Sequence, residues 1–183
     1  MVTKPRIIQP NNDYHVYNRS ANKLRIFHSD TDYNRWFNKI INIKKQTKTI
    51  IIAWAILPNH YHFLLKEPDL KTINSCHFTG SIKTSISQFT SRIENAYTKY
   101  YNFKHQHTGI IFQGPYRSLL IKNDAHLKEI LYYINGNAVK HKIVSDIDDW
   151  PYTSYHDYTN KRKNLSIVDK LPTRRVDPTR RVG

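Results

Sequence analysis

Hydrophobic positions recur along the chain with two periods, and the changes between them predict its secondary structure. Alternation of apolar and polar side chains is typical of a strand, and apolar spacing of three or four residues is typical of an amphipathic helix. Residues 14–19 alternate, and residues 50–56 form a β-branched and aromatic run, so both segments predict strands. Residues 33–48 and 81–103 have helical spacing and predict two long helices.

A break in the pattern separates the second strand from a third. Residues 57–59 read Leu-Pro-Asn, which ends a strand because proline cannot donate a ladder hydrogen bond and asparagine tolerates turn geometry. Residues 60–66 resume as a strand, and residues 125–141 predict a third helix. Residues 110–121 predict a fourth strand segment that is bent at Gly114 and Pro115. The order β-α-β-β-α-β-α predicts an α+β fold, a ferredoxin-like antiparallel sheet with helices packed on it.

Composition fits one folded domain followed by a basic extension. The chain has 183 residues, of which 39% are hydrophobic. We expect residues 1–160 to form the domain and residues 161–183, which hold eight lysines and arginines, to form a flexible basic tail. No run is long enough to span a membrane and no signal pattern opens the chain, so we expect a cytoplasmic protein without a membrane partner.

The charge balance changes the picture from a generic domain to a binder of polyanions. The formal net charge is +15, and thirteen tyrosines offer flat rings on which unpaired bases can stack. A basic protein without a ligand, or one that binds an acidic membrane surface, has the same balance. No long basic amphipathic helix supports the membrane alternative, so the charge favours nucleic acid.

Two histidines open the third predicted strand. His60 and His62 are two residues apart, and on a strand such side chains leave the same face. Two imidazoles side by side on an otherwise apolar strand are costly unless something binds them, and a divalent metal is one candidate. Two hydrogen-bonded histidines at a strand end fit the same spacing, so the pair alone does not decide between these interpretations.

The third predicted helix carries a candidate nucleophile. At about 100° per residue, Tyr133, Asn137 and Lys140 fall on one flank of the apolar stripe, whereas Tyr132 falls on the opposite flank. Tyr133 and Asn137 are one turn apart, so a tyrosine hydroxyl and an amide oxygen could face one cleft. Ordinary packing of a tyrosine at the edge of a core explains the same pattern.

Five motifs in order make the sequence resemble a known family. They cover residues 14–19, 57–65, 112–118, 133–141 and 149–155. Each motif is weak alone, but together they are similar to the HUH-type single-tyrosine insertion-sequence transposases, especially the REP-associated tyrosine transposase branch. These enzymes cleave and rejoin single-stranded DNA at hairpin-bearing sites.

The resemblance implies roles for particular residues. The histidine pair of the family falls on His60 and His62, its third metal ligand on Asn137, and its nucleophile on Tyr133. It also implies a 5′-phosphotyrosine intermediate with a free 3′-hydroxyl, and a divalent metal. Phosphate chemistry favours Mg²⁺ or Mn²⁺, while Zn²⁺ would suit a structural role.

Basic residues outside this set are candidates for DNA contacts. Arg117 lies in the third motif, Lys140 lies beside the candidate ligand, and Arg174 and Arg175 lie in the basic extension. Each could bind a phosphate, although a solvated surface charge is the ordinary role of such residues. The family contains monomers that act in cis and homodimers that share tyrosines, so both states are open.

Two positions depart from the pattern of the family. Ala138 stands where the family commonly has proline, and Gly136 stands where a larger residue is usual. A second hypothesis is therefore a domesticated protein that binds DNA hairpins without cleaving them. A third is a ribonucleoprotein factor in which tyrosines and basic residues hold RNA.

Overall fold

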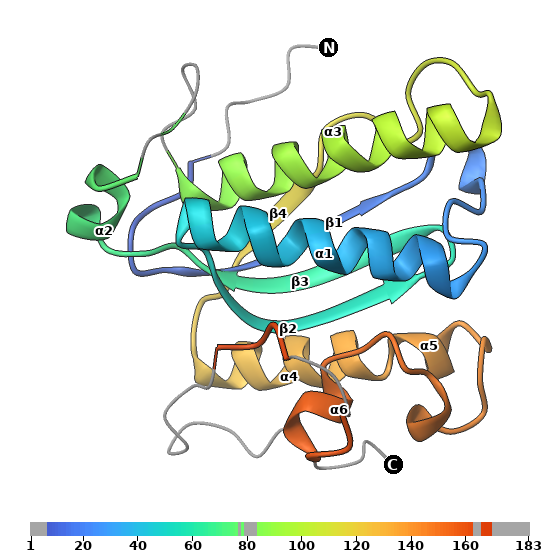
Figure 1. Cartoon of the computed structure of the whole chain (residues 1–183). Coiled ribbons are helices and arrows are strands. Elements are labelled where there is room, and N and C mark those ends of the chain that lie inside the picture. The colour runs from blue at the N-terminus through green and yellow to red at the C-terminus, as the bar shows by residue number, and fades with distance from the viewer. Residues whose placement is uncertain (1–6, 77, 79–83, 163–165, 170–183) are drawn as a thin grey trace.

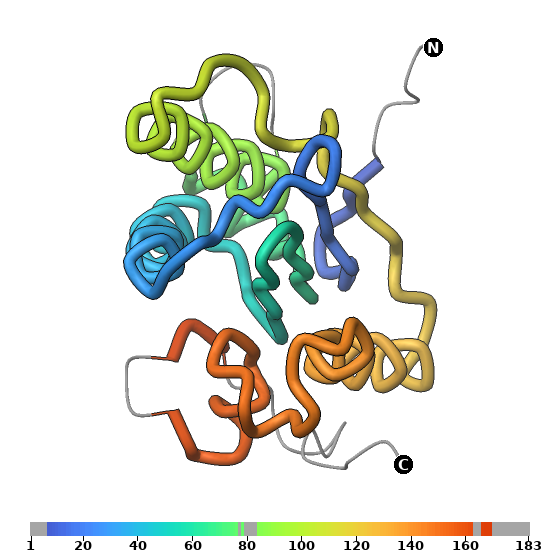
Figure 2. The backbone as a smooth tube through the Cα atoms, turned by 90° about the vertical axis from the view of Figure 1, so that its right-hand side faces the viewer, coloured from blue at the N-terminus to red at the C-terminus, as the bar shows by residue number. Residues whose placement is uncertain are grey.

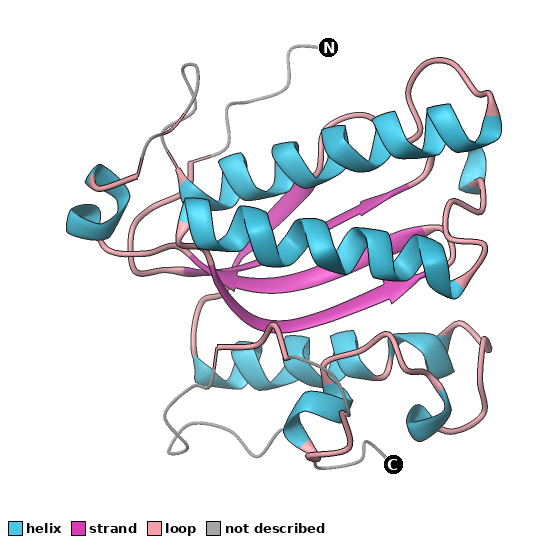
Figure 3. Cartoon of the chain, viewed as in Figure 1, coloured by secondary structure: helices cyan, strands magenta, loops and turns pink. Residues whose placement is uncertain are grey.

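The computed structural model describes residues 7–76, 78, 84–162 and 166–169 (Figure 1). Helices lie on both sides of one sheet (Figure 3). The elements in chain order are β1 (Asp13–Arg19), η1 (Ala21–Lys23), α1 (Asp30–Thr47), β2 (Ile50–Leu57), β3 (His60–Lys66), α2 (Leu70–Asn74), α3 (Ser85–His105), β4 (Arg117–Leu120), α4 (Asp124–Asn135), α5 (Asn137–Lys140), η2 (Ile147–Asp149) and α6 (Tyr155–Tyr158).

The four strands form one antiparallel sheet in the order β2-β3-β1-β4. Helices α1 and α3 pack together on one face, while α4, α5 and α6 lie on the other (Figure 2). The prediction of an α+β fold with an antiparallel, ferredoxin-like sheet is confirmed. Among the helices of the described residues, none is long and apolar enough to cross a membrane.

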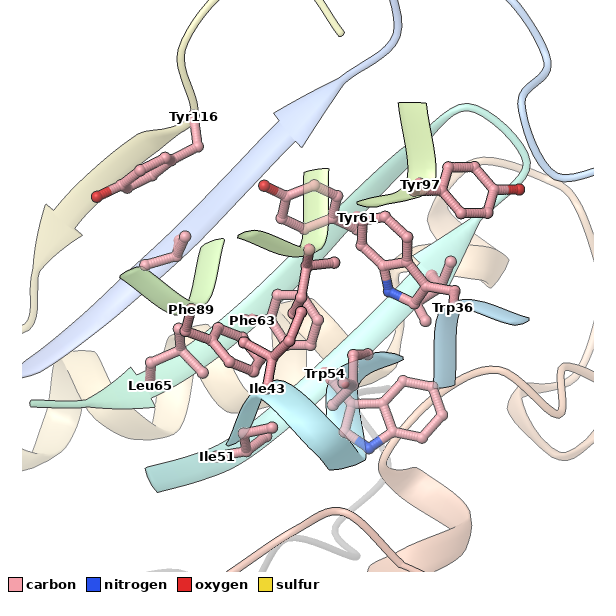
Figure 4. Packing of buried hydrophobic residues seen from close by; sticks show 14 of the residues in the cluster. Trp36, Ile43, Ile51, Trp54, Tyr61, Phe63, Leu65, Phe89, Tyr97 and Tyr116 are labelled. Atoms are coloured by element: carbon pink, nitrogen blue, oxygen red, sulfur yellow. The ribbon is translucent and has the colours of Figure 1, made fainter. Parts of the chain in front are cut away.

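The alternation of β3 divides the molecule into two layers of core. Tyr61, Phe63 and Leu65 point toward α1 and α3, where they pack in the larger cluster drawn in Figure 4. Leu64 belongs to the smaller cluster under α4. Side chains of one strand alternate between faces, so His60 and His62 share the α4 side with Leu64. The predicted orientation of the histidine pair is confirmed.

A β-bulge in β2 adjusts the surface on which α4 packs. The pairing with β3 shifts between Ile51 and Ala53, so that Ile52 and Ala53 both turn toward the α4 cluster. Ala55 follows on the same face. The short alanine side chains let the helix lie close to the strand, and this packing holds α4 against the end of β3.

The start of α1 is fixed by a buried carboxylate. Asp32 accepts hydrogen bonds from the backbone N–H groups of His28 and Ser29 at 2.8 and 3.1 Å, which closes the capping box. Its other oxygen accepts from the Tyr100 hydroxyl at 2.8 Å and from Lys104 Nζ at 2.6 Å. Burial raises the pKa of this carboxyl, but the hydrogen bonds outweigh burial and lower the pKa to about 2. Asp32 thus ties α1 to α3.

The free edge of β2 is covered by the C-terminal part of the chain. The N–H of Ile56 donates to the carbonyl of Tyr152, and further along the edge the N–H of Ile51 donates to the carboxylate of Asp169. Lys44 pairs with Asp169 at 2.7 Å, and Ile167 is buried. Residues 166–169 therefore pack on the domain. The domain boundary at residue 160 stays a prediction, and Arg174 and Arg175 lie outside the described residues.

Two predicted elements are wrong in extent. The predicted bend is present, since Gly114 has a φ of +74°. The regular strand after it is only β4, and before it only an isolated bridge pairs Phe112 with Ser20. The helix predicted over residues 125–141 ends at Asn135 and a short helix begins at Asn137. The polar connection after β3 also contains the short helix α2.

Candidate active site

An open cleft of about 670 Å³ lies where β1 and β3 meet the α4–α5 junction. It brings together four residues that the sequence singled out: His60, His62, Tyr133 and Arg117. Asn137 is fully buried and contacts His60 from the helix side. The predicted catalytic and metal-binding residues therefore meet at one place.

The imidazole of His60 is held between two asparagines. Its Nδ1 lies 2.6 Å from Oδ1 of Asn59, and Nδ2 of Asn59 donates to the carbonyl of Lys23 at 3.2 Å. The Lys23 carbonyl thus fixes which end of the Asn59 amide faces the ring. Because a carboxamide oxygen can only accept, Nδ1 of His60 carries the proton.

The other nitrogen of His60 then faces an acceptor without a proton between them. Burial lowers the pKa of His60 to about 4, so the ring is neutral near pH 7 and its Nε2 carries a lone pair instead of a proton. This Nε2 lies 3.2 Å from Oδ1 of Asn137. Turning the Asn137 amide over would supply a donor to His60. It would also move Oδ1 to the position that Nδ2 now occupies, where the side chain has no hydrogen-bond partner among the described residues.

A divalent cation fits this arrangement. Two ligands about 2.1 Å from a metal at a right angle are about 3 Å apart, close to the separation of His60 Nε2 and Asn137 Oδ1. Within the part of the chain that the structure describes, no group of three His, Cys, Asp or Glu side chains could hold a metal. A metal here would therefore take the amide oxygen of Asn137 as a ligand, together with the imidazoles.

A third histidine lies behind His62. Nε2 of His15 is 2.9 Å from Nδ1 of His62, which leaves Nε2 of His62 as the nitrogen available to a ligand. Both rings are buried, and burial lowers the pKa of His15 to about 4 and that of His62 well below its usual value. His15 was missed by sequence reasoning. Its signal was the alternation of β1, which places it on the face of Tyr17, the residue paired with His62.

Tyr133 stands edge-on to His62 with the ring centroids 5.4 Å apart. Nζ of Lys140 lies 4.5 Å from the centroid of the tyrosine ring. The predicted common flank of Tyr133, Asn137 and Lys140 survives the break at Gly136. The N–H of Gly136 still donates four residues back, to Tyr132, at 2.9 Å.

The rim of the cleft is basic. Arg19 and Lys23 line it beside Arg117. His141 lies on its helix side, with its ring centroid 4.9 Å from that of His60. Arg19, Lys23 and His141 were not assigned a role from the sequence, because nothing in a local pattern tells that these segments converge. Cations around a pair of neutral imidazoles suit a phosphodiester.

Comparisons with known proteins show what the chain is similar to. No family model matches the chain. A Haemophilus influenzae protein that bears the name of the REP-associated tyrosine transposases is 33% identical over 107 residues, which are 57% of this chain and 58% of that protein. The REP-associated tyrosine transposase of Escherichia coli K12 is 26% identical over 129 residues, which are 69% of this chain and 66% of that protein.

A solved structure shares the whole fold. It is a REP-associated tyrosine transposase bound to a REP hairpin, with a TM-score of 0.68 and 19% identity, and the match covers 100% of this chain and 99% of that chain. The matched regions span less than two thirds of the two curated relatives. The fold of this chain is thus that of the matched structure. The resemblance to the REP-associated tyrosine transposase branch is confirmed by these relatives.

Proposed function

We propose that this protein is a transposase that cleaves and rejoins single-stranded DNA at hairpin-bearing sites through Tyr133. The observation that carries the proposal is the position of Tyr133. Its ring lies beside His62 in a basic cleft, next to the facing pair of His60 and Asn137. The names of the relatives support a DNA substrate, and the hairpin in the matched structure supports its form.

The reaction is a displacement at phosphorus. The Oη of Tyr133 attacks the scissile phosphorus, the Oη–P bond forms, and the bond from phosphorus to the 3′ oxygen breaks. The proton of the tyrosine hydroxyl ends on the leaving 3′ oxygen. A 3′-hydroxyl and a 5′-phosphotyrosine result, and attack by a 3′-hydroxyl of another strand reverses the step and joins the DNA.

The other residues of the cleft bind and orient the phosphate. His60, His62 and Asn137 would hold Mg²⁺ or Mn²⁺, which when bound polarises the phosphate and stabilises its developing charge. Arg117 on β4 offers two parallel N–H donors to two oxygens of the phosphate. Lys140 supplies a positive charge 4.5 Å from the centroid of the Tyr133 ring.

Capture of a covalent adduct tests this function. The wild-type protein, mixed with a labelled single-stranded hairpin oligonucleotide and Mn²⁺, should form an adduct that survives denaturation. Tyr133→Phe removes only the hydroxyl, so it should bind the hairpin and form no adduct. Tyr132→Phe is the matched control and should keep activity. A covalent peptide that maps to any tyrosine other than Tyr133 would refute the assignment.

The second candidate function is hairpin binding without cleavage, and the helix break favours it. The chain leaves the regular helix at Gly136, between the nucleophile and the third ligand, where a longer helix would hold both rigidly. Hairpin binding without an adduct under Mg²⁺ or Mn²⁺ would support this alternative. Equal binding of an RNA hairpin would favour a role on RNA.

A further inference from the structure

A second basic surface lies on the other side of the sheet from the cleft. Helices α1 and α3 run side by side there (Figure 2), and an open groove of about 770 Å³ lies between them. Four cations line it, two from each helix. They are Arg35 and Lys39 on α1, and Arg92 and Lys99 on α3. No carboxylate is among the described residues that line it.

Among the described residues, no ion pair neutralises the charge of this groove. Across the described residues, the ion pairs are Lys44–Asp169, Lys104–Asp32, Lys161–Asp148 and Arg162–Asp157, and none involves a cation of the groove. Arg92 donates to the amide oxygen of Gln46, and Arg35 lies 5.5 Å from the centroid of the Tyr100 ring. Both contacts leave the positive charge in place, so the groove attracts an anion.

Aromatic side chains accompany the cations. Phe103, near the end of α3, is 89% exposed, and the ring of Tyr100, one turn before it, is half-buried. An exposed phenyl ring next to a row of cations gains nothing from the core of the domain. Rings beside a positively charged groove are the combination that single-stranded nucleic acids use, because bases stack on the rings while phosphates follow the cations.

We propose that the α1–α3 groove binds a single-stranded DNA segment, with phosphates on Arg35, Lys39, Arg92 and Lys99 and a base stacked on Phe103. Duplex DNA fits less well, because its bases are stacked inside the helix and present no face to Phe103. The cleft and the groove lie on opposite faces of the sheet, so the groove would hold a part of the DNA remote from the scissile phosphate. The proposal does not depend on cleavage at Tyr133.

The salt dependence of DNA binding tests whether the four cations of the groove contact phosphates. The probe is a fluorescent oligothymidylate, measured without metal by anisotropy over a range of salt concentrations. The variant is the full chain with Arg35→Gln, Lys39→Gln, Arg92→Gln and Lys99→Gln. The matched control removes the same charge elsewhere with Lys45→Gln, Lys71→Gln, Lys122→Gln and Lys128→Gln. Each phosphate contact on a single strand contributes about 0.7 to the slope of log K against log salt. The slope of the groove variant should therefore be about 3 smaller in magnitude than that of the wild type.

A separate substitution tests the stacking. Phe103→Ala should weaken binding about tenfold and leave the salt slope unchanged, because it removes a ring and no charge. Ile110→Ala is its control, since Ile110 is also highly exposed. Thermal unfolding of every variant, unchanged from wild type, shows that a loss of binding is not a loss of fold.

Three results would overturn the proposal. An equal loss of slope in the groove variant and the charge control would show that only net charge matters. Unchanged DNA affinity of Phe103→Ala would show that no base stacks on Phe103. Displacement of the probe by duplex DNA as readily as by single strands would make the groove a duplex surface. Each of these results is independent of whether the protein forms an adduct.

Discussion

His60 Nε2 and Asn137 Oδ1 face each other at 3.2 Å although the two residues are 77 positions apart. One belongs to the first residue of β3 and the other to the first residue of α5. The contact exists because α4 packs on β2 and β3, so that α5, which follows it in the chain, lies at the start of β3. A neutral imidazole nitrogen opposite an amide oxygen is a place for a cation.

Removal of a proposed ligand should weaken metal binding. His60→Ala deletes the ring between Asn59 and Asn137, so the affinity for Mn²⁺ should fall by more than the roughly 10- to 100-fold that changes outside the ligand shell cost. Isothermal titration of the protein with Mn²⁺ measures this directly, without a cleavage assay. His107→Ala, in the loop after α3, is the control and should bind Mn²⁺ as the wild type does. Equal affinity in both variants would exclude His60 as a ligand.

The sequence predicted the features that follow from the residue period of a single strand or helix. Alternation placed His60 and His62 on one face because a strand has a fixed period of two, and helical spacing placed Tyr133 and Asn137 one turn apart. These predictions hold because each depends on residues within a few positions of one another.

What the sequence did not predict depends on distant segments. The hydrogen bond between His15 and His62 joins β1 to β3, and no local pattern pairs the two residues. The packing of Ile167 in the larger core cluster was missed because residues 161–183 hold eight lysines and arginines, which are typical of a solvated tail. The break at Gly136 is a local feature, but glycine in a helix costs only about 1 kcal/mol, so composition alone does not decide whether a helix ends there.

Acid should weaken the domain through Asp32. The folded pKa is about 2 and the unfolded pKa is about 3.9, so ionised Asp32 stabilises the fold above about pH 4. This contribution, on the order of 2 kcal/mol, is lost as the pH falls toward 2. Asp32→Asn should therefore be less stable than wild type at pH 7, and the difference should shrink at pH 2.5. Urea unfolding at both pH values measures it.

A matched variant separates this effect from general charge. Glu129→Gln removes an exposed carboxylate and should change the free energy of unfolding little at either pH. If the deficit of Asp32→Asn were the same at pH 7 and pH 2.5, the ionised form of Asp32 would not be what stabilises the junction of α1 and α3.

The basic extension should contribute to the salt dependence of DNA binding. A truncation after Asp169 removes Lys170, Arg174, Arg175, Arg180 and Arg181 and keeps the residues that cover the edge of β2. Each lost phosphate contact should reduce the slope of log K against log salt by about 0.7 on single strands. Anisotropy with a labelled hairpin that has a single-stranded flank measures the slope. An identical slope in the truncated and full chains would show that the extension does not touch DNA.

His15 should act on the metal through His62. Its Nε2 lies 2.9 Å from Nδ1 of His62, so the hydrogen bond fixes the ring and keeps Nε2 of His62 toward the cleft. His15→Ala leaves this nitrogen without its partner, and Mn²⁺ affinity should fall roughly 10- to 100-fold, as for the loss of other outer-shell partners.

A conservative variant separates positioning from folding. His15→Gln offers an amide that can hydrogen-bond Nδ1 of His62, so it should recover a large part of the Mn²⁺ affinity that His15→Ala loses. Thermal unfolding without metal should be similar for the two variants, because both remove the same buried ring from β1. If His15→Gln and His15→Ala bind Mn²⁺ equally weakly while both stay folded, the hydrogen bond is not what orients His62, and packing of the His15 ring is.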